Sequence, residues 1–320
     1  MASPFFSIII PVHNRAELLG RTLESVIAQK FSDFEVVIVD DGSTDGTSAV
    51  IESFCSNDSR FRGIYQEKRG VSATRNRGIG EVVCEWVVFL DSDDLMFPET
   101  LEVFREWIVK YPQADVVAGY TEHIDENDCA FDIPSYDNWD DPESYGLRTK
   151  AYEECIKRYG FLPGMYALRR SALGNEIRFD ESLTVCEDYD FILRVLKTKS
   201  LYRDPRKIHR YRWHTGKTEP DKFSPVRLAL AEKHLREDSE SGRYRSDRSV
   251  RAEWYHRMAD DYYQMGANRQ ARTHYLRALA SNLKKIVDLS LSRQLIATFF
   301  PSVVRAFIRK HFKSNSNPEV

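Results

Sequence analysis

Three carboxylates stand directly after a run of apolar residues. Asp91, Asp93 and Asp94 follow VVFL in the segment VVFLDSDDLMFPE, and the chain then meets Pro98. Carboxylate oxygens suit Mg²⁺ and Mn²⁺, which keep some waters and bind substrate phosphates, so few protein ligands are needed. A D-x-D pair at the tip of a rigid strand could therefore hold such a cation. The alternative is turn capping, in which Asp side chains accept hydrogen bonds from nearby backbone N–H groups.

The first hundred residues contain the elements that would position these carboxylates. Continuous apolar runs predict buried strands at 6–12, 34–41 and 85–90, and helical spacing predicts helices at 16–29, 47–56 and 70–82. This alternation predicts a mostly parallel sheet, in which ligands bind beyond the carboxyl ends of the strands. Asp40 and Asp41 end one predicted strand as Asp91 follows another. We therefore expect the two acidic clusters to share one crevice.

Composition and charge limit the classes of function. The chain has 320 residues, 42% apolar and 30% charged, which is enough for one large α/β domain and a smaller appendage. Its net charge of −3 disfavours a general nucleic-acid-binding surface. Five widely spaced cysteines without a CxxC pair favour reduced thiols in a cytoplasmic protein. The first apolar run is too short for a signal peptide, and we expect no membrane-spanning helix.

The second half of the chain has a different pattern. Residues 121–150 are polar and rich in turn formers, which predicts a long loop or lid over the site. After Pro225 the pattern is wholly helical, so we expect one domain over 1–222 and a helical region over 223–320. Tyr and Ala spacing within this region matches one tetratricopeptide-like hairpin, or simply a packed helix pair. The basic amphipathic segment 295–313 could rest on an anionic membrane surface or dock on its own domain.

Five motifs in a fixed order carry a family resemblance. They are SIIIPVHNR, VVIVDDGSTDGT, GVSATRNRGI, FLDSDD and CEDYDFILR, and they span residues 6 to about 196. Together they resemble the family 2 glycosyltransferases. The resemblance implies an α/β fold of the GT-A nucleotide-diphospho-sugar transferase type, with a Rossmann-like, mostly parallel sheet and here an all-helical C-terminal extension. It also implies metal-dependent, inverting transfer of a sugar from a nucleotide-diphosphate sugar, which we expect to be a UDP-sugar.

The resemblance places the donor pocket in the first four motifs. Asp91 would face the ribose or uracil, and Asp93 would bind the metal. Asp41 would accept the N–H of uracil, because a fixed carboxylate accepts such a donor well. Arg75 could stack on the base, bond it, or pair with Asp91. The residues expected to bind the nucleotide sugar are Pro11, Val12, Asn14, Asp41, Arg75, Asp91, Ser92 and Asp93.

The motif CEDYDF supplies the carboxylate that inverting transfer needs. The attacking hydroxyl must lose its proton during a single displacement, and one nearby carboxylate suffices. Asp188 shares the helical face of Ile192 and Val195, so it points inward. The resemblance makes Asp188 the base, whereas the alternative is an acid favoured by the helix dipole. The acceptor side would include Glu187 and Gly164, where glycine allows close backbone approach.

Basic and imidazole side chains complete the predicted site. In relatives a histidine after the base helix is a metal ligand, and the spacing points to His214 rather than His209. A lone histidine is otherwise more often structural, and the metal could be Mn²⁺ or Mg²⁺. Asp94 would organise its loop. Arg169 and Arg170 could meet an anionic acceptor or form a solvated turn.

Two other functions fit parts of the sequence. A Rossmann dehydrogenase needs GxGxxG after the first strand. This chain has PVHNRAE there, which disfavours a dehydrogenase. A non-catalytic partner-binding protein on a glycosyltransferase-like domain could use the helical tail, but the intact carboxylates favour an enzyme. Because the QxxRW signature of polymer synthases is missing, we predict single-sugar transfer to a glycan or lipid-linked acceptor in polysaccharide or glycoconjugate biosynthesis. We expect a cytoplasmic protein, peripheral at the inner face of the membrane if the tail binds lipid, and no nucleic-acid partner.

Overall fold

The structure is a computed structural model that describes residues 3–132, 145–149, 151–157, 162–214, 223–240, 248–282 and 298. The chain divides into two compact units, residues 1–217 and 218–320. Both acidic clusters and the motif CEDYDF lie in the first unit. The boundary expected after residue 222 adjoins positions 215–222, which lie outside the described residues.

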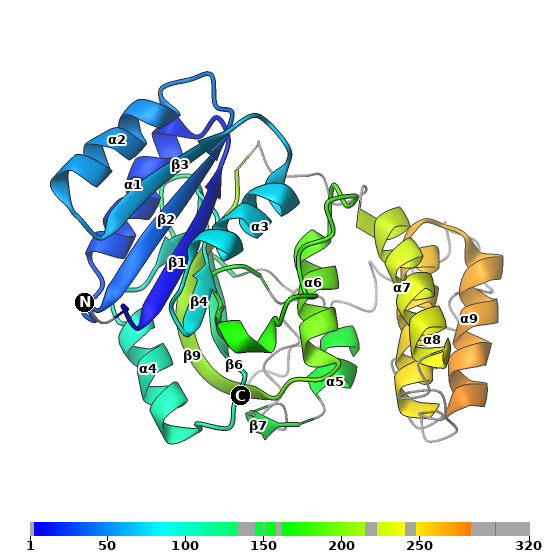
Figure 1. Ribbon diagram of the computed structural model, residues 1–320. Coiled ribbons are helices and arrows are strands. Elements are labelled where there is room, and N and C mark those ends of the chain that lie inside the picture. Colours follow the sequence, from blue (N-terminus) through cyan, green and yellow to red (C-terminus); the bar gives the residue numbers. More distant parts are fainter. Residues whose placement is uncertain are drawn as a thin grey trace, which may run out of the picture. The chain divides into compact units, whose positions relative to one another are not determined.

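Strands and helices alternate over residues 6–89 of the first unit, and the apolar pattern predicted all of these elements except the strand at 61–66 (Figure 1). Its first half contains β1 (Phe6–Val12), α1 (Ala16–Ile27), β2 (Phe34–Asp41), α2 (Thr47–Asn57), β3 (Phe61–Gln66), α3 (Val71–Glu81), β4 (Trp86–Phe89), β5 (Leu95–Met96) and α4 (Thr100–Lys110). Its second half contains β6 (Val116–Ile124), β7 (Gly146–Arg148), α5 (Ala151–Lys157), β8 (Tyr166–Arg169), a 3₁₀ turn (Arg170–Ala172), α6 (Glu187–Leu196) and β9 (Leu201–Arg212).

One mixed sheet organises the unit. Within the described residues its strand order is β3-β2-β1-β4-β8-β6-β9-β5, with β7 paired to β9. The pairs β1–β2, β2–β3, β1–β4 and β6–β9 are parallel, and β8 is antiparallel to both β4 and β6. The predicted parallel half is confirmed, and an antiparallel strand joins it to a second parallel pair.

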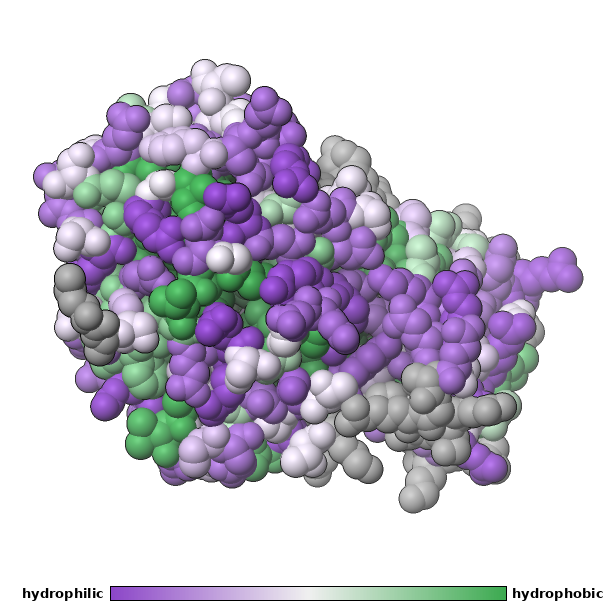
Figure 2. Space-filling view, viewed as in Figure 1, coloured by the Kyte–Doolittle hydropathy of each residue, from purple (hydrophilic) through white to green (hydrophobic). Residues whose placement is uncertain are grey.

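Helices cover both faces of the sheet. The face of Phe6, Ile8 and Ile10 packs against α1, α2 and α4 in one apolar cluster. On the other face α3 approaches β1 so closely that a Cβ at Gly78 would lie 2.4 Å from Ile9. The ring of Phe89 also contacts Phe179 and Phe191 there. Apolar side chains therefore fill both faces, while Figure 2 shows a largely hydrophilic exterior on the side viewed.

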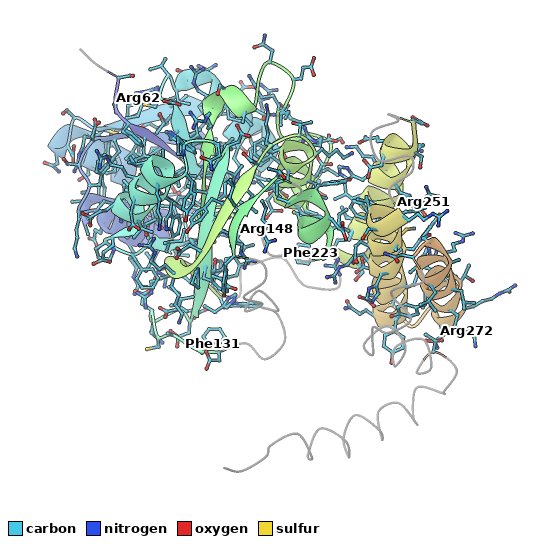
Figure 3. All side chains as sticks on the ribbon, turned by 90° about the horizontal axis from the view of Figure 1, so that it is seen from below. Arg62, Phe131, Arg148, Phe223, Arg251 and Arg272 are labelled. Carbon is cyan, nitrogen blue, oxygen red and sulfur yellow. The ribbon has the colours of Figure 1, made fainter. Side chains whose placement is uncertain are left out.

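Three parts of the fold differ from the sequence expectation, namely the predicted loop over 121–150 and the strands β3 and β9. Residues 121–124 belong to β6 and residues 146–148 form β7, so the predicted loop over 121–150 is wrong at both ends. Residues 133–144 of that loop lie outside the described residues. The edge strand β3 and the long strand β9 were not predicted, because β3 is half exposed and β9 contains Pro205 and many charged residues. Figure 3 shows Phe131, shortly after β6, at the margin of the unit.

Most of the described residues of the second unit are helical. It contains α7 (Phe223–Glu240), α8 (Arg248–Gln264) and α9 (Asn268–Ser281). A short turn at Gly266, whose φ is +76°, joins α8 to α9, and Ala259, Ala271, Tyr275 and Ala278 form their shared core. Whether this pair is a tetratricopeptide-like unit stays a prediction. The tail at 295–313 lies outside the described residues apart from Thr298, and no described helix is long and apolar enough to cross a membrane.

Candidate active site

Both acidic clusters lie at the carboxyl edge of the parallel strands. In the sheet register Val12 on β1 lies beside Asp40 on β2, and β4 on the other side of β1 runs into Asp91. Parallel strands present their carboxyl ends at one edge, where α/β proteins bind ligands. The structure therefore confirms that the two clusters share an edge.

The Asp40–Asp41 turn is held by its own hydrogen bonds. Asp40 accepts from the backbone N–H of Ser43 at 3.0 Å and from Ser48 Oγ at 3.0 Å. Asp41 accepts from Gln66 Nε2 and from the N–H groups of Arg69 and Gly70, each at 2.8 Å. Burial alone would raise the pKa of Asp41, but these donors outweigh it and lower the pKa. Asp41 is therefore a fixed anion at this edge.

The turn after β1 is tied to the turn after β2. Asn14 has a φ of 51°, and its side-chain oxygen accepts from the N–H of Thr44 at 2.8 Å. Its own N–H donates to Ser43 Oγ at 2.9 Å. Pro11 and Val12 are buried, while Asn14 is exposed at the edge. Of the three residues predicted here, Asn14 has the accessible side chain.

A buried arginine joins the second acidic cluster to the motif CEDYDF. Arg75 on α3 is 2% exposed. Its Nη2 donates to Asp91 Oδ1 at 2.7 Å, and its Nη1 donates to Glu187 Oε1 at 2.8 Å. Burial opposes the charge of Arg75, but Asp91, Glu187 and Asp188 together raise its pKa. Among the roles considered for Arg75, the structure shows the pairing with Asp91.

Asp188 lies in the first turn of α6. Cys186, just before the helix, has a φ of 61°, and the carboxylates of the first turn suit the positive end of the helix dipole. Asp188 is partly buried, and its Oδ1 accepts from the N–H of Tyr189 at 2.7 Å. Burial of the Asp188 carboxyl and the negative charge of Glu187 raise the pKa of Asp188 to about 7, although the positive charge of Arg75 opposes this shift. A carboxyl with such a pKa can take up a proton near neutral pH.

Asp93 and His214 face each other at the same edge. His214 Nε2 lies 2.8 Å from Asp93 Oδ2, and Arg15 Nε lies 3.9 Å from the same oxygen. No group of three or more His, Cys, Asp or Glu side chains with metal-binding geometry occurs among the described residues. One carboxylate and one imidazole nevertheless fit a hard cation that completes its shell with phosphate and water. Ser92 is buried, and its carbonyl accepts from Thr22 Oγ1 at 3.0 Å.

Asp94 has a structural position, as expected for a residue that organises the loop. It is 0% exposed and accepts from the N–H of Arg212 at 2.9 Å. Its other oxygen lies 3.1 Å from His209 Nε2. Gly164, with a φ of +91°, packs on that imidazole, and a Cβ there would lie 2.3 Å from the ring. The close approach that glycine allows is therefore to His209, which supports Asp94.

Two predicted basic residues lie away from the site. Arg169 on β8 pairs in register with Trp86, at the start of β4 and thus at the opposite edge of the sheet. Its guanidinium bonds Glu85 and the carbonyl of Pro112 at 2.9 Å. Arg170 Nε donates to the carbonyl of Cys84 at 3.0 Å. The suggestion that Arg169 and Arg170 meet an acceptor is wrong, because both side chains fasten the far end of the sheet.

Sequence reasoning missed Arg212, which holds the Asp93–Asp94 loop from the end of β9. Its Nε donates to the carbonyl of Asp93 at 2.8 Å. A signal was present, since Arg210 and Arg212 alternate with aromatic residues in HRYRWH, as expected for two faces of a strand.

With this geometry in view, similarity to known proteins places the chain in a family. The sequence model described as "Glycosyl transferase family 2" matches residues 7–175, more than half of the chain. The chain belongs to glycosyl transferase family 2.

Curated relatives of this family member match parts of it. It is 31% identical over 184 residues to glycosyltransferase GlyA of Streptococcus pneumoniae serotype 4, covering 54% of this chain and 25% of GlyA. It is 30% identical over 219 residues to the uncharacterized glycosyltransferase RT0329 of Rickettsia typhi, covering 68% of this chain and 66% of RT0329. The alignments thus span a quarter of GlyA and just under two thirds of RT0329.

Solved structures share the fold over nearly the whole chain. Staphylococcus aureus TarS 1–349 in complex with UDP-GlcNAc has a TM-score of 0.64 at 21% identity, covering 92% of this chain and 89% of that one. Mannosyltransferase PcManGT from Pyrobaculum calidifontis, in complex with GDP-Man and Mn²⁺, has a TM-score of 0.55 at 16% identity, covering 93% and 80%. The predicted GT-A fold with a helical C-terminal region is confirmed.

Proposed function

We propose that this family member is a metal-dependent, inverting glycosyltransferase that moves one sugar from a nucleotide-diphosphate sugar to an acceptor hydroxyl. The observation that carries the proposal is the guanidinium of Arg75, which bonds Asp91 and Glu187 at once. This contact brings the carboxylate loop after β4 beside the first turn of α6. A donor-binding loop and a general base therefore lie on either side of one buried cation.

Asp188 is the general base of the proposed reaction. As the acceptor oxygen bonds the anomeric carbon, the bond from that carbon to the diphosphate breaks, and the hydroxyl proton passes to Asp188. One displacement inverts the anomeric centre. The pKa of about 7 allows Asp188 to accept this proton near neutral pH, and Glu187 beside it helps to keep it there. Arg75 keeps Glu187 and Asp91 in place while the proton moves.

Asp93 and His214 are the residues that would hold Mn²⁺ or Mg²⁺. The 2.8 Å contact between His214 Nε2 and Asp93 Oδ2 supports this assignment, because the two side chains reach the same point. A divalent cation bound there would neutralise charge that develops on the departing diphosphate. The Mn²⁺ in PcManGT, a protein of the same fold, supports a divalent metal.

The donor pocket is formed along the carboxyl edge of β1, β2 and β4. Asp41 faces the base, Asp91 faces the ribose, and Asn14, Ser92 and the ends of β1 complete the pocket. The UDP-GlcNAc bound by TarS supports a uridine nucleotide. Both oxygens of Asp41 already accept hydrogen bonds from the chain, so a uracil N–H would use a remaining lone pair.

The acceptor is a glycan or lipid-linked glycan that approaches from the side of Glu187 and Gly164. We assign catalysis to a domain over 1–222 and further contacts to the helices beyond it. Contact with an anionic membrane through the tail would place the enzyme peripherally at the inner face. Binding to anionic liposomes at low salt, lost when the chain is truncated after residue 282, tests this part separately.

Release of nucleoside diphosphate tests the proposed reaction. The protein is incubated with UDP-, GDP- and TDP-sugars, Mn²⁺ and a panel of glycans, and NMR follows the anomeric configuration of the product. We expect turnover of one nucleotide class with inversion, and its loss in Asp188→Asn. Nucleotide binding without turnover on a broad panel would favour a partner-binding protein instead.

A further inference from the structure

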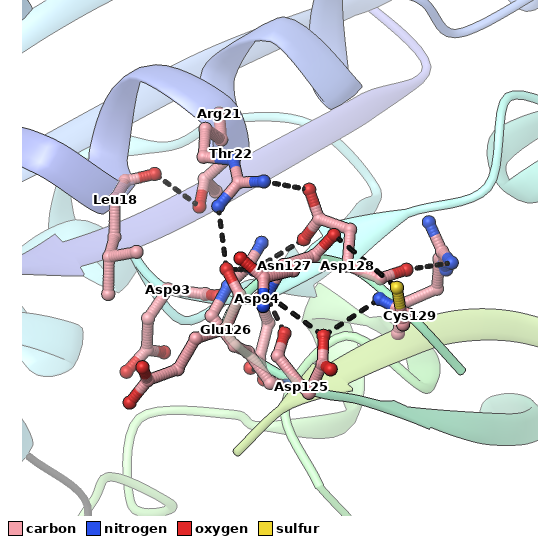
Figure 4. Close-up of polar contacts among 12 residues, drawn as sticks. Leu18, Arg21, Thr22, Asp93, Asp94, Asp125, Glu126, Asn127, Asp128 and Cys129 are labelled. Atoms are coloured by element: carbon pink, nitrogen blue, oxygen red, sulfur yellow. Dashed lines mark hydrogen bonds and ion pairs between the residues drawn. The ribbon is translucent and has the colours of Figure 1, made fainter. Parts of the chain in front are cut away.

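The turn that follows β6 is built to present oxygen atoms. Ile124 and Ala130 pair across it, and Asp125 Oδ1 accepts from the N–H groups of Asn127 and Cys129 at 2.8 and 2.9 Å. Asp128 has a φ of 64°, which closes the turn (Figure 4). These bonds fix residues 125–129 as a rigid turn beside the Asp93–Asp94 loop.

Arg212 connects this turn to the loop that carries Asp93. The Arg212 side chain is 1% exposed, so its charge needs a fixed counter-charge. That counter-charge is Asp128, whose Oδ1 forms an ion pair with Arg212 Nη1. The same Nη1 lies 3.3 Å from the carbonyl of Asp125, while Nε donates to the carbonyl of Asp93 at 2.8 Å. One guanidinium therefore spans both loops.

The second oxygen of Asp128 ties the same cluster to α1. Arg21 Nη2 bonds Asp128 Oδ2, and Arg21 Nη1 donates to the carbonyl of Glu126 at 3.0 Å (Figure 4). Asp128 is thus held between two arginines from different elements. Its position cannot drift without moving Arg212 and, through it, the backbone of Asp93.

We propose that Asp128 and Arg212 are positioning residues of the metal site. Asp128 orients Arg212. Arg212 in turn fixes the position of Asp93 relative to His214, because His214 lies two residues after Arg212 in the chain. The inference rests on the proposed metal role of Asp93 and His214. In this proposal neither Asp128 nor Arg212 is a ligand of the metal. Loss of such supporting contacts typically weakens metal affinity about 10–100-fold.

Asp128→Asn is the informative substitution. Asn tolerates a positive φ as well as Asp does, so the turn is kept while the charge between the two arginines is removed. Asp204→Asn is the matched control. Asp204 lies near the start of β9 and accepts from the N–H and Nε of Arg206 at 3.0 and 2.9 Å. The change therefore also removes a carboxylate charge from an arginine on this strand, although Arg206 keeps its ion pair with Glu106.

Electron paramagnetic resonance of free Mn²⁺ gives the dissociation constant without nucleotide. We expect Asp128→Asn to weaken Mn²⁺ binding about tenfold or more, and Asp204→Asn to change it less than about twofold. Equal Mn²⁺ affinity in both variants, even with lowered thermal stability, would overturn the proposal. If Asp128→Asn does not fold, Arg21→Met takes its place. This substitution removes the other arginine that pairs with Asp128, and the Arg21 side chain is 40% exposed. That variant should then weaken Mn²⁺ binding relative to Asp204→Asn.

Amide hydrogen exchange tests the positioning in metal-free protein. The N–H of Arg212 bonds Asp94 and that of Trp213 bonds the carbonyl of Ile124, so both report on the clamped strand end. We expect faster exchange at these amides in Asp128→Asn but not in Asp204→Asn. If wild-type protein binds neither Mn²⁺ nor Mg²⁺, with or without UDP, the proposed metal function fails. Unchanged exchange in Asp128→Asn would independently refute the positioning role.

Discussion

Asp188→Asn should strongly lower turnover and yet stabilise the protein above neutral pH. The carboxyl is partly buried beside Glu187, and its pKa in the folded protein is about 7, against an ordinary value of 3.8. That difference corresponds to at most about 4 kcal/mol of unfavourable free energy for the charged form. Part of the carboxyl still reaches water, which screens the interaction, so we expect a gain of about 1–2 kcal/mol.

The direction of this pH dependence follows from the raised pKa of Asp188. Below about pH 4 the carboxyl is protonated in both the folded and the unfolded chain, and it contributes no pH dependence. Between about pH 4 and pH 7 the unfolded chain loses the proton first, so the folded state becomes less stable as pH rises. Above about pH 7 the carboxyl is charged in both states, and the loss of folding stability is complete. The advantage of the uncharged Asn should therefore grow across this window.

Urea unfolding in EDTA at about pH 5 and about pH 8 measures this effect. The Asp188→Asn midpoint should exceed that of wild type by more at the higher pH. The control is Asp190→Asn, because Asp190 is 0% exposed and accepts from Arg194 Nε at 2.7 Å. That variant should lose stability at both pH values. If the stability advantage of Asp188→Asn is absent, or equal at the two pH values, the raised pKa of Asp188 is refuted. The same variant should lose about 10²–10⁴-fold in turnover.

Three further substitutions test other parts of the site. Asp93→Ala should abolish Mn²⁺ binding and metal-dependent transfer, and unchanged Mn²⁺ affinity by calorimetry would contradict its role as a ligand. Arg75→Met should lower the free energy of unfolding by at least about 2 kcal/mol, because two carboxylates lose their shared buried cation; an unchanged urea midpoint would argue against that. Gly164→Ala should destabilise the protein by more than about 1 kcal/mol, since a φ of +91° and the ring of His209 both exclude a Cβ, whereas Gly174→Ala, with a φ of +54° and open space, should cost less in thermal stability.

The parallel half of the fold could be predicted because its strands are buried on both faces. Continuous apolar runs such as SIIIPV leave little choice of structure, and the strand ends then place Asp41 and Asp91 at one edge. The second half lacks such runs. Strand β9 carries Arg203, Arg210 and Arg212, which are accommodated only because carboxylates and aromatic rings meet them across the fold.

The same reasoning explains which site residues could be found. Asp93, Asp188 and His214 have side-chain chemistry that motif spacing can indicate. Arg169 looked equally suitable, but the antiparallel register of β8 carries it to the far end of the sheet. Asp128 was beyond prediction, since its role depends on Arg21 and Arg212, which are distant from it in the sequence.

Calorimetric titration of UDP into the protein, with and without Mn²⁺, tests the central claim most directly. We predict binding that strengthens with Mn²⁺ in wild type, and loss of that strengthening in Asp93→Ala. A site at the carboxyl edge that joins metal and diphosphate requires both results. Binding of UDP that ignores Mn²⁺ and Asp93, or no binding of any nucleoside diphosphate, would contradict the proposed donor site.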